Sequence, residues 1–494
     1  MGVRVRYPPS PTGFQHIGSV RTALYNYLYS RRTGGTLILR IEDTDRKRFV
    51  PEALQDIYDT FEWLGFHWDE GPDLGGPYAP YFQSERVEIY RKYAEDLLSR
   101  GLAYKCFCTA ERLDSLRAQQ QAAKTGESGD QSAQGYDRHC CTLSESEVRA
   151  AEASGVPCVV RLKVPLEGST AYRDILLGEI TVENKVISPD PVLIKSDGFP
   201  TYHMANVVDD HLMEVTHIMR GQEWLPSVPV HVILYHALGW EPPVYCHLPM
   251  VMGKDGHKLS KRLGSTSVKD FRAQGYLPDA LLNCIAMVGW SYDDSRELFS
   301  LKDLEELFDI SRLTKSPGVF DYQKLEWFNG MYIRAKTRTQ LAELIKPFMK
   351  QAGLPSEDKS VLEGIAGLVQ ERVKVLSEVP AMVRFIFEDP VVPPAEELLA
   401  KNVEPARAVD AMRRLIAVLP ELSGSDEQAE ARLRALADEL GMKLGDLLMP
   451  LRVALTGSRV SPPLIASIKV MGAAVARRRA ESALAALEEF AARS

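Results

Sequence analysis

The chain has 494 residues, of which 45% are hydrophobic, 26% charged and 8% aromatic, a composition typical of a globular protein with several domains. No run of 18 apolar residues occurs, and the first residues lack the apolar core of a signal peptide, which argues against a membrane span and against secretion. We therefore expect a cytoplasmic protein.

The distribution of charge gives little indication of partners. The net charge is −8, and residues 323–494 carry 24 Lys+Arg against 23 Asp+Glu, whereas residues 1–322 carry 35 against 44. An acidic balance does not indicate a nucleic-acid binder, but a near-neutral region can still present a positive face. Charge alone neither supports nor excludes an RNA partner.

The first forty residues predict a strand, a Pro- and Gly-rich loop, a helix and a second strand. β-branched residues favour strands at 3–6 and 36–41, and the helix between them has one apolar face. That face consists of Val20, Ala23, Leu24, Tyr27 and Leu28. Such a βαβ unit implies a parallel sheet whose ligands bind beyond the carboxyl ends of its strands.

The rest of the chain divides by composition and periodicity. Residues 117–135 are polar and short of large apolar side chains, so we expect a mobile loop without regular structure. β-branched residues at 159–164 and 179–187 predict a small sheet in an insertion. From about residue 323 the apolar residues recur with a helical period and prolines interrupt them, which predicts an all-α tail.

The tetrapeptide His16-Ile17-Gly18-Ser19 stands between the early loop and the first predicted helix. A helix N-terminus offers unpaired N–H groups and a partial positive charge, Gly18 allows a ligand to approach closely, and an imidazole can donate to a phosphate oxygen. This segment alone does not distinguish a phosphate-binding histidine from an ordinary surface histidine near a helix cap.

A second candidate is the basic segment Lys258-Leu259-Ser260-Lys261-Arg262, which has glycines on both sides. Lysines at positions i and i+3 of such a loop can reach the same phosphate group while the loop stays free to close. An ordinary basic surface loop is the alternative interpretation.

Taken together, the two segments resemble the two signatures of class I aminoacyl-tRNA synthetases, of the His-Ile-Gly-His and Lys-Met-Ser-Lys-Ser types. Ser19, Leu259 and Arg262 are departures from those patterns, and the same departures are typical of glutamyl-tRNA synthetases. Other segments similar to that family are 9–13, 21–24, 40–45, 196–203 and 206–211. The resemblance covers nearly the whole chain, and residues 117–135 are the main stretch without a counterpart.

The reaction implied by this resemblance needs cations more than an acid–base pair. The amino-acid carboxylate attacks the α-phosphorus of ATP, so negative charge builds on the phosphoryl oxygens and on the leaving pyrophosphate. The resemblance implies catalytic roles for His16, Ser19, Lys258 and Lys261. It implies ATP binding, with Mg²⁺, by His16, Gly18, Trp224, Lys258, Ser260 and Lys261, although a core position for Trp224 is equally consistent with the sequence.

A glutamate pocket needs a fixed cation for the γ-carboxylate, and the planar guanidinium of arginine can meet a carboxylate with two hydrogen bonds. The resemblance places the glutamate-binding residues at Arg6, Ser10, Glu42, Tyr202, Asn206 and Arg220. Within this set it implies that Arg220 faces the γ-carboxylate and that Glu42 faces the ammonium group.

Four of the seven cysteines lie close together in the sequence, at Cys106, Cys108, Cys140 and Cys141. Thiolates are soft ligands that suit Zn²⁺. Some bacterial glutamyl-tRNA synthetases bind zinc through a Cys-x-Cys, Tyr-x-x-x-Cys pattern, and the positions similar to it are Cys106, Cys108, Tyr136 and Cys140. His139 and Cys141 remain alternatives for the fourth ligand, and metal-free thiols remain an alternative to the whole structural site.

Arg372 resembles the residue that tests the third anticodon base in enzymes restricted to glutamate tRNA. A guanidinium there can hydrogen-bond to a base edge that a different base could not satisfy. An exposed helical arginine without a role in RNA binding is the alternative.

The predicted architecture is an α/β protein with a doubly wound parallel-sheet (Rossmann) catalytic domain, an α+β insertion and all-α anticodon-binding domains. The first and second halves of the catalytic domain are expected at 1–83 and 201–256, around an acceptor-binding insertion at 84–200. A stem-contact domain with the Lys258 loop follows at 257–322, and helical anticodon-binding domains occupy 323–394 and 395–494.

The predicted function is glutamate–tRNA ligation in a monomer, with ATP, L-glutamate and tRNA-Glu as partners and no membrane association. A tRNA-modifying paralogue would lack the helical tail, and a glutaminyl enzyme would be expected to end in β-barrels. A relative that had lost catalysis and acts only in RNA binding or regulation would normally lose His16, Lys258 or Lys261, and all three are present. Whether the enzyme also charges tRNA-Gln stays open.

Overall fold

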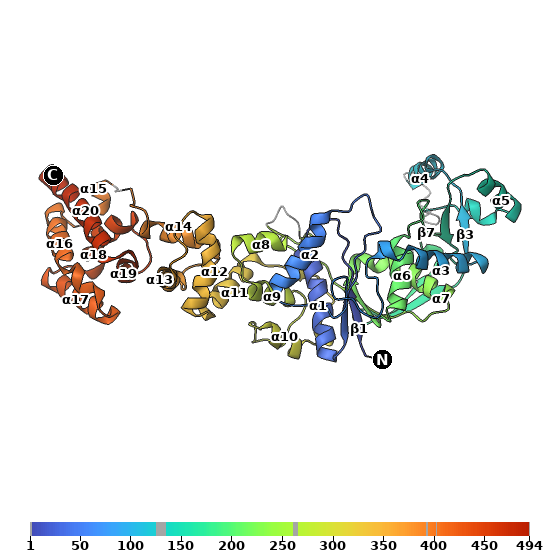
Figure 1. Cartoon of the computed structure of the whole chain (residues 1–494), viewed down its shortest axis with the longest axis horizontal. Helices are drawn as coiled ribbons and strands as arrows, with labels where there is room; N and C mark the ends of the chain where they lie inside the picture. Colours follow the sequence, from blue (N-terminus) through green and yellow to red (C-terminus); the bar gives the residue numbers. More distant parts are fainter. Residues whose placement is uncertain (1, 125–134, 260–264, 392–393, 402, 494) are drawn as a thin grey trace. The chain divides into compact units, whose positions relative to one another are not determined.

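The computed structural model describes residues 2–124, 135–259, 265–391, 394–401 and 403–493. The chain forms two compact units (Figure 1), the first made of residues 1–271 and 281–322 and the second of 272–280 and 323–494. The predicted division into six parts is finer than this and stays a prediction. Within the described ranges, no helix has both the length and the apolar character needed to cross a membrane.

The strands belong to the first unit. They are β1 (Arg4–Tyr7), β2 (Thr36–Leu39), β3 (Ala103–Cys106), β4 (Val159–Leu162), β5 (Ser169–Asp174), β6 (Gly178–Glu183), β7 (Val192–Ile194), β8 (His217–Gly221), β9 (Val244–Leu248), β10 (Val251–Met252) and β11 (Gly318–Val319). Its helices are α1 (Ile17–Thr33), α2 (Pro51–Leu64), α3 (Val87–Ser99), α4 (Ala110–Lys124), α5 (Glu145–Ala153), α6 (Tyr202–Leu212), α7 (Val228–Ala237) and α10 (Leu301–Leu307). The helices α8 (Val268–Gln274) and α9 (Pro278–Ala286) have residues in both units.

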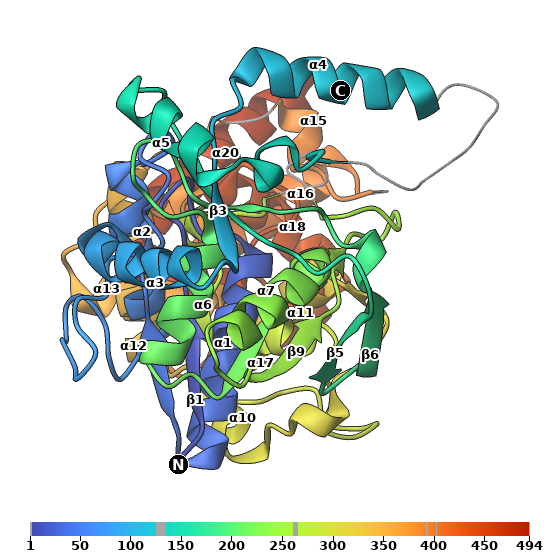
Figure 2. The same ribbon diagram turned by 90° about the vertical axis from the view of Figure 1, so that its right-hand side faces the viewer.

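Parallel pairing dominates the centre of the first unit. β1 pairs with β2, with Val5 opposite Leu37, and β8 and β5 both pair in parallel with β9. Thr216, next to β8, donates its backbone N–H to the carbonyl of Arg4 at 2.9 Å and so brings β8 beside β1. β6 adds an antiparallel edge next to β5 (Figure 2). This arrangement confirms the predicted α/β fold with a parallel sheet.

Helix α1 is positioned by both of its ends. His16 is its N-cap residue, and Gly34 ends it in the left-handed conformation at φ 62°, which costs glycine little. The apolar face predicted from the sequence is buried. Gly35 makes the turn into β2 possible, because a Cβ there would lie 2.3 Å from the carbonyl oxygen of Val3. The predicted βαβ unit is therefore confirmed.

Of the two β-branched segments predicted to form a small sheet in the insertion, 179–187 instead supplies β6 to the sheet β6-β5-β9-β8. Segment 159–164 supplies β4 to the antiparallel sheet β3-β4-β7 of the insertion. Its core includes Tyr90 of α3, Leu162 of β4 and Leu193 of β7, and it continues into the packing of α6 and α7.

The expectation of a structureless loop over residues 117–135 is wrong in its first part, because residues 117–124 belong to α4, the long helix at the top of Figure 2. The segment is rich in alanine and glutamine, which favour helices even without a core to pack against. Gln120 also hydrogen-bonds to Gly135, donating at 2.8 Å to its carbonyl and accepting at 3.1 Å from its N–H. Residues 125–134 lie outside the described residues.

The second unit is helical over its described residues, which confirms the predicted all-α tail. Its helices are α11 (Tyr322–Ala335), α12 (Arg338–Gln351), α13 (Lys359–Val369), α14 (Val379–Val383), α15 (Ala395–Leu398), α16 (Pro405–Val418), α17 (Asp426–Glu439), α18 (Leu444–Thr456), α19 (Leu464–Met471) and α20 (Ala473–Arg493). Thr337, Asp358 and Ser425 cap helices through their side chains, which satisfies N–H groups that a helix start leaves unpaired.

Candidate active site

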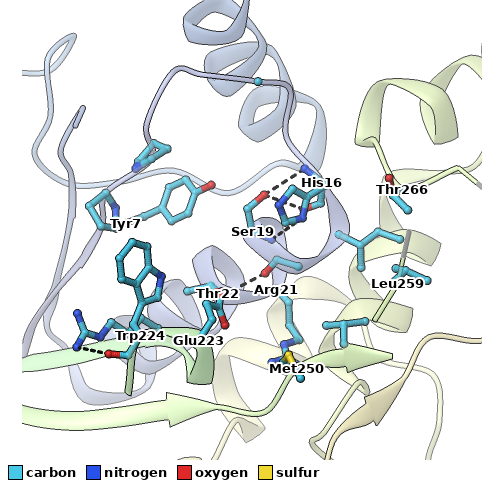
Figure 3. Close-up of a pocket in the computed structure, with 18 of the residues that line it drawn as sticks. Tyr7, His16, Ser19, Arg21, Thr22, Glu223, Trp224, Met250, Leu259 and Thr266 are labelled. Atoms are coloured by element: carbon cyan, nitrogen blue, oxygen red, sulfur yellow. Dashed lines mark hydrogen bonds between the residues drawn. The ribbon is translucent and has the colours of Figure 1, made fainter. Parts of the chain in front are cut away.

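A cavity of about 900 Å³ opens in the first unit where β1, the start of α1 and the end of β8 meet. Figure 3 shows part of its lining, with Tyr7 and Trp224 on one side, Leu259 and Thr266 on the other, and His16 and Ser19 between them. The residues predicted from the sequence that line this cavity are Arg6, His16, Gly18, Ser19, Glu42, Tyr202, Arg220, Trp224 and Lys258. Arg6 and Lys258, which are 252 positions apart in the chain, thus line one cavity.

His16 is held by the helix that it caps. Its Nδ1 accepts the backbone N–H of Ser19 at 3.2 Å, and the Ser19 hydroxyl accepts the backbone N–H of His16 at 3.1 Å. Because Nδ1 is an acceptor, the neutral ring carries its proton on Nε2. Desolvation lowers the pKa of His16, and the charge of Lys258 lowers it further. His16 is therefore a neutral donor at the N-terminus of α1.

Gly18 leaves room for the imidazole. A Cβ at this position would lie 3.1 Å from Cε1 of His16, closer than an ordinary van der Waals contact. The glycine thus lets the ring lie over the first turn of α1.

Lys258 is held near the cavity by backbone pairing, since it forms a bridge with Met252 and the next residue, Leu259, donates its N–H to Val251 at 3.1 Å. Lys258 and His16 line the same cavity. Ser260 and Lys261, which the sequence also placed at the ATP, lie outside the described residues.

Arg220, at the end of β8, is 5% exposed and is held from several directions. Its Nη1 donates to the hydroxyl of Tyr202 at 2.7 Å, and its Nη2 lies 3.3 Å from Oγ of Ser227 and 3.4 Å from the carbonyl of Trp224. Its Nε donates to Nε2 of His247 at 3.1 Å. The guanidinium is therefore a fixed cation in the cavity wall, suited to a carboxylate ligand.

Arg6 and Glu42 lie on a buried charge network. Nε of Arg6 donates to Asp210 at 3.1 Å, and Nη1 of Arg6 is buried without a partner among the described residues. Oε1 of Glu42 accepts from Arg40 at 3.2 Å, and Arg40 also donates to Asp210 at 2.7 Å. Burial raises the pKa of Glu42 despite the attraction of Arg40 and Arg6. A cationic ligand group beside Glu42 would favour its charged form.

Ser10 and Asn206 do not line the cavity with the other predicted glutamate-binding residues. Ser10 is exposed, on the loop after β1. Asn206 is fully buried on α6. With its amide oriented to satisfy its neighbours, it donates to Asp210 and accepts from Arg40, each at 3.2 Å. Asn206 thus lies behind the cavity wall and supports the network.

Trp224 faces the cavity and not the core. It is 40% exposed, and its ring lies 4.4 Å from that of Tyr202 at an interplanar angle of 36°. An exposed aromatic face in a cavity can stack on a base or flank a substrate.

A separate cluster of sulfur atoms lies in the insertion. The Sγ atoms of Cys106, Cys108 and Cys140 lie within 4.8 Å of one another, and the hydroxyl of Tyr136 lies 3.3 Å from Cys106 and 3.6 Å from Cys108. Three thiols and one phenol around one point fit a four-coordinate Zn²⁺ site. Cys141 instead accepts from Arg138 at 3.7 Å, so the geometry favours Tyr136 over Cys141 as the fourth ligand.

Arg372 belongs to the second unit. It is exposed in the turn that follows α13, and so it is not the exposed helical arginine of the alternative interpretation. It lines a cavity of about 570 Å³ together with exposed apolar residues, Val391 and Val460. Asp389, which also lines this cavity, is paired with Arg478 at 2.7 Å.

Sequence reasoning missed the residues behind Arg220. His247 and Asp174 are fully buried and belong to different strands, so no local spacing links them to Arg220. A histidine within an otherwise apolar strand, Val244–Leu248, was the one available signal.

Comparisons with known proteins agree with this geometry. Residues 2–327 match the family described as class I tRNA synthetases (E and Q), catalytic domain, and residues 340–484 match an anticodon binding domain. A glutamate–tRNA ligase of Treponema denticola is 52% identical, covering 98% of this chain and 99% of its own. One of Borreliella burgdorferi is 49% identical, covering 96% of each.

Solved structures give the same result. A crystal structure of a glutamate tRNA ligase from Elizabethkingia meningosepticum, in complex with its amino acid, superposes with a TM-score of 0.88 at 35% identity, covering 98% of this chain and 99% of that one. A glutamate-tRNA synthetase from Elizabethkingia anophelis has a TM-score of 0.87 at 36% identity, covering 98% of this chain and all of that one. By its sequence, its fold and its cavity, the chain belongs to the glutamate–tRNA ligase family of class I tRNA synthetases.

Proposed function

We propose that this chain activates L-glutamate with ATP and transfers the glutamyl group to the 3′ end of tRNA-Glu, releasing AMP and pyrophosphate. The observation that carries the proposal is the meeting of phosphate-binding and carboxylate-binding groups in one cavity. His16 and Lys258 supply the first kind and Arg220 supplies the second, while Glu42 supplies an anion for the ammonium group of the substrate. Near-full-length relatives named glutamate–tRNA ligase support this assignment.

In the activation step, the α-carboxylate of glutamate attacks the α-phosphorus of ATP, which enters as its magnesium complex. Nε2–H of His16 and the ammonium of Lys258 lie where they can stabilise charge that develops on the phosphate oxygens. The dipole of α1 adds a partial positive charge at its N-terminus. A preorganised donor of this kind contributes about 3 kcal/mol to the transition state. Ser19 acts by holding His16, and we assign Ser260 and Lys261 to the same phosphates.

The site would recognise glutamate at both its γ-carboxylate and its α-ammonium group. Arg220 faces the γ-carboxylate with a guanidinium held by Tyr202, and Glu42 faces the α-ammonium group. The buried Nη1 group of Arg6 has no partner among the described residues, which suits a substrate oxygen. We propose that Asn206 acts from behind through Asp210 and Arg40, and that Ser10 joins the site only when substrate is bound. Trp224 would flank the ATP side.

In the transfer step, a ribose hydroxyl at the tRNA 3′ end attacks the activated carbonyl. This step needs no covalent enzyme intermediate, and positioning supplies most of the rate advantage. We assign recognition of the third anticodon base to Arg372, because its exposed guanidinium lies next to apolar surface on which a base could stack. The helical second unit argues against a glutaminyl enzyme ending in β-barrels and against the tRNA-modifying paralogue.

We further propose that Cys106, Cys108, Tyr136 and Cys140 bind one structural Zn²⁺. Bound there, the ion would crosslink β3 to the segment around Tyr136 and so stabilise the insertion, without an open coordination position for catalysis. We expect the enzyme to act as a monomer in the cytoplasm.

The test is to charge purified tRNA-Glu and tRNA-Gln with glutamate, side by side. We expect ATP-dependent charging of tRNA-Glu, and charging of tRNA-Gln at the same rate would show that the enzyme is not restricted to the first. We also expect pyrophosphate exchange to depend on tRNA, and exchange at full rate without RNA would overturn that expectation. Failure to charge either tRNA with glutamate, while another amino acid is accepted, would overturn the proposed function.

A further inference from the structure

Three fully or almost fully buried polar residues are joined by hydrogen bonds across neighbouring strands behind the cavity. Asp174 ends β5, His247 lies in β9 and Arg220 lies in β8. Arg220 is directly opposite His247 in the parallel pairing of β8 with β9, and Asp174 is opposite Tyr245 in the pairing of β5 with β9. The register of the sheet therefore brings together residues that are 73 and 27 positions apart in the chain.

Which atom donates in each of these hydrogen bonds follows from the donor and acceptor groups that the three side chains carry. Oδ2 of Asp174 accepts both the backbone N–H and the Nδ1–H of His247, at 3.0 and 2.7 Å. Nε of Arg220 can only donate, and it does so to Nε2 of His247 at 3.1 Å. His247 is therefore neutral, with its proton on Nδ1 and a lone pair directed at Arg220.

Asp174 is itself held in place. Its Oδ1 accepts the backbone N–H groups of Leu176 and Leu177 at 2.8 and 2.9 Å, so the carboxylate closes the turn after β5. Neither Asp174 nor His247 lines the cavity. The two residues can affect a substrate only through Arg220.

We propose that His247 and Asp174 are positioning residues that fix the plane of the Arg220 guanidinium, and that this fixed plane is what distinguishes a substrate γ-carboxylate from a γ-carboxamide. The inference rests on the proposed function. With Nε held by His247, the remaining N–H groups of Arg220 are those of Nη1 and Nη2, which also contact Tyr202, Ser227 and Trp224 at the cavity wall. A planar guanidinium in a set orientation meets two carboxylate oxygens with two donors, whereas an amide presents one oxygen and one NH₂ that repels a donor.

The opposite arrangement of protons would disrupt the site. If His247 carried a proton on Nε2, two N–H groups would face each other across the Arg220 contact and the guanidinium would have to turn. Asp174 prevents this, because its carboxylate has no proton to offer and so holds the proton of His247 on Nδ1. The same logic operates wherever a carboxylate sets the tautomer of a functional histidine.

The experiment compares His247→Phe, which removes the acceptor, with His247→Gln, which can restore an acceptor to Nε of Arg220. The matched control is His217→Phe, since His217 lies on β8, the strand of Arg220, and contacts Thr216 and Tyr29. For each variant, KM for glutamate, KM for ATP and kcat are measured in charging of tRNA-Glu. The selectivity for glutamate over glutamine is measured in the same assay.

We expect His247→Phe to raise KM for glutamate roughly tenfold to a hundredfold, the range for loss of a hydrogen bond to a charged group. KM for ATP should stay unchanged, and selectivity for glutamate over glutamine should fall. His247→Gln should recover most of the loss, and His217→Phe should resemble the natural enzyme. A His247→Phe enzyme with natural KM and selectivity would overturn the inference, whereas a natural enzyme that does not charge tRNA-Glu would overturn the proposed function instead.

A second measurement does not depend on the folding of His247→Phe. KM for glutamate is followed from about pH 7.5 to about pH 5 in the natural enzyme and in His247→Gln. Burial lowers the pKa of His247, and the charges of Arg220 and Arg6 lower it further, while Asp174 raises it. His231 is a further titratable group, and the charge of a protonated His247 lowers its pKa. KM should rise at acid pH in the natural enzyme and much less in His247→Gln. Identical profiles would contradict the inference.

Discussion

Nδ1 of His16 accepts the backbone N–H of Ser19 at the first turn of α1. This single contact fixes the ring over the helix N-terminus and leaves the Nε2 proton for a ligand in the cavity. The residue thus has two roles that different substitutions can separate, because one depends on an acceptor at Nδ1 and the other on a donor at Nε2.

Substitution of His16 should affect activity more than stability if the substitute can still cap the helix. Asparagine is a good N-cap residue, but its side chain does not reach the position of Nε2. We expect His16→Asn to fold normally and to lower kcat by about 10²–10³-fold, the usual effect of losing one preorganised donor. Tm and charging kinetics measure the two effects, and near-natural kcat in a folded His16→Asn enzyme would remove His16 from the mechanism.

The pair formed by His203, which is partly buried, and His231, which is fully buried, should make the protein less stable in acid. Nδ1 of His203 lies 3.1 Å from Nε2 of His231, and burial lowers the pKa of His203 to about 4 from 6.5. The unfolded chain therefore binds a proton more readily than the folded protein. Above about pH 6.5 this difference does not reduce the free energy of unfolding, and as the pH falls from there towards about 4 the free energy of unfolding falls.

This loss should amount to roughly 3 kcal/mol of unfolding free energy. Urea unfolding at a series of pH values measures it, and His203→Gln should show a flatter dependence over that range. An unchanged pH dependence in His203→Gln would mean that other groups cause the acid destabilisation.

The carboxylate of Asp210 is shared by the guanidinium groups of Arg6 and Arg40, and all three side chains are almost completely buried. Asp210→Ala would leave two charges without their shared partner, which should cost about 3–5 kcal/mol. We expect a fall in Tm on the order of 10 °C, measured by calorimetry. The control is Asp96→Ala in the exposed pair with Arg100, where the change should be below about 1 kcal/mol.

Metal analysis tests the thiol cluster in the insertion. We expect about one equivalent of zinc per chain, and loss of that zinc together with a lower Tm in Cys140→Ser. Cys158→Ser is the matched control, since Cys158 lies outside the cluster, and it should keep the metal. Substantially less than one equivalent in undialysed protein would count against the site.

Arg372 can be tested without disturbing the active site. Arg372→Gln should reduce kcat/KM for tRNA-Glu by roughly tenfold, as expected for one lost contact to a base edge, and KM for glutamate should not change. Arg413→Gln, which removes an exposed arginine paired with Glu488 in the same unit, is the control. Equal effects of the two variants would indicate a general charge effect and not base recognition.

The sequence alone determined what depends on neighbours along the chain. Apolar periodicity placed α1 and the helices after residue 323, and β-branched runs placed the strands of the first βαβ unit. The two signature segments and the Cys-x-Cys pair were visible as short strings of residues. The exception was residues 117–124, where composition suggested a loop although alanine and glutamine favour the helix that forms.

Only the tertiary structure decided which distant residues meet. Asp174 and His247 reach Arg220 because the order and register of β5, β9 and β8 put them in one line, and that order is set by packing over the whole first unit. The same packing buries Asn206 behind the cavity wall and places Trp224 in the lining of the cavity. Strand order and register depend on burial of surfaces that lie far apart in the chain, so no local pattern could have contained them.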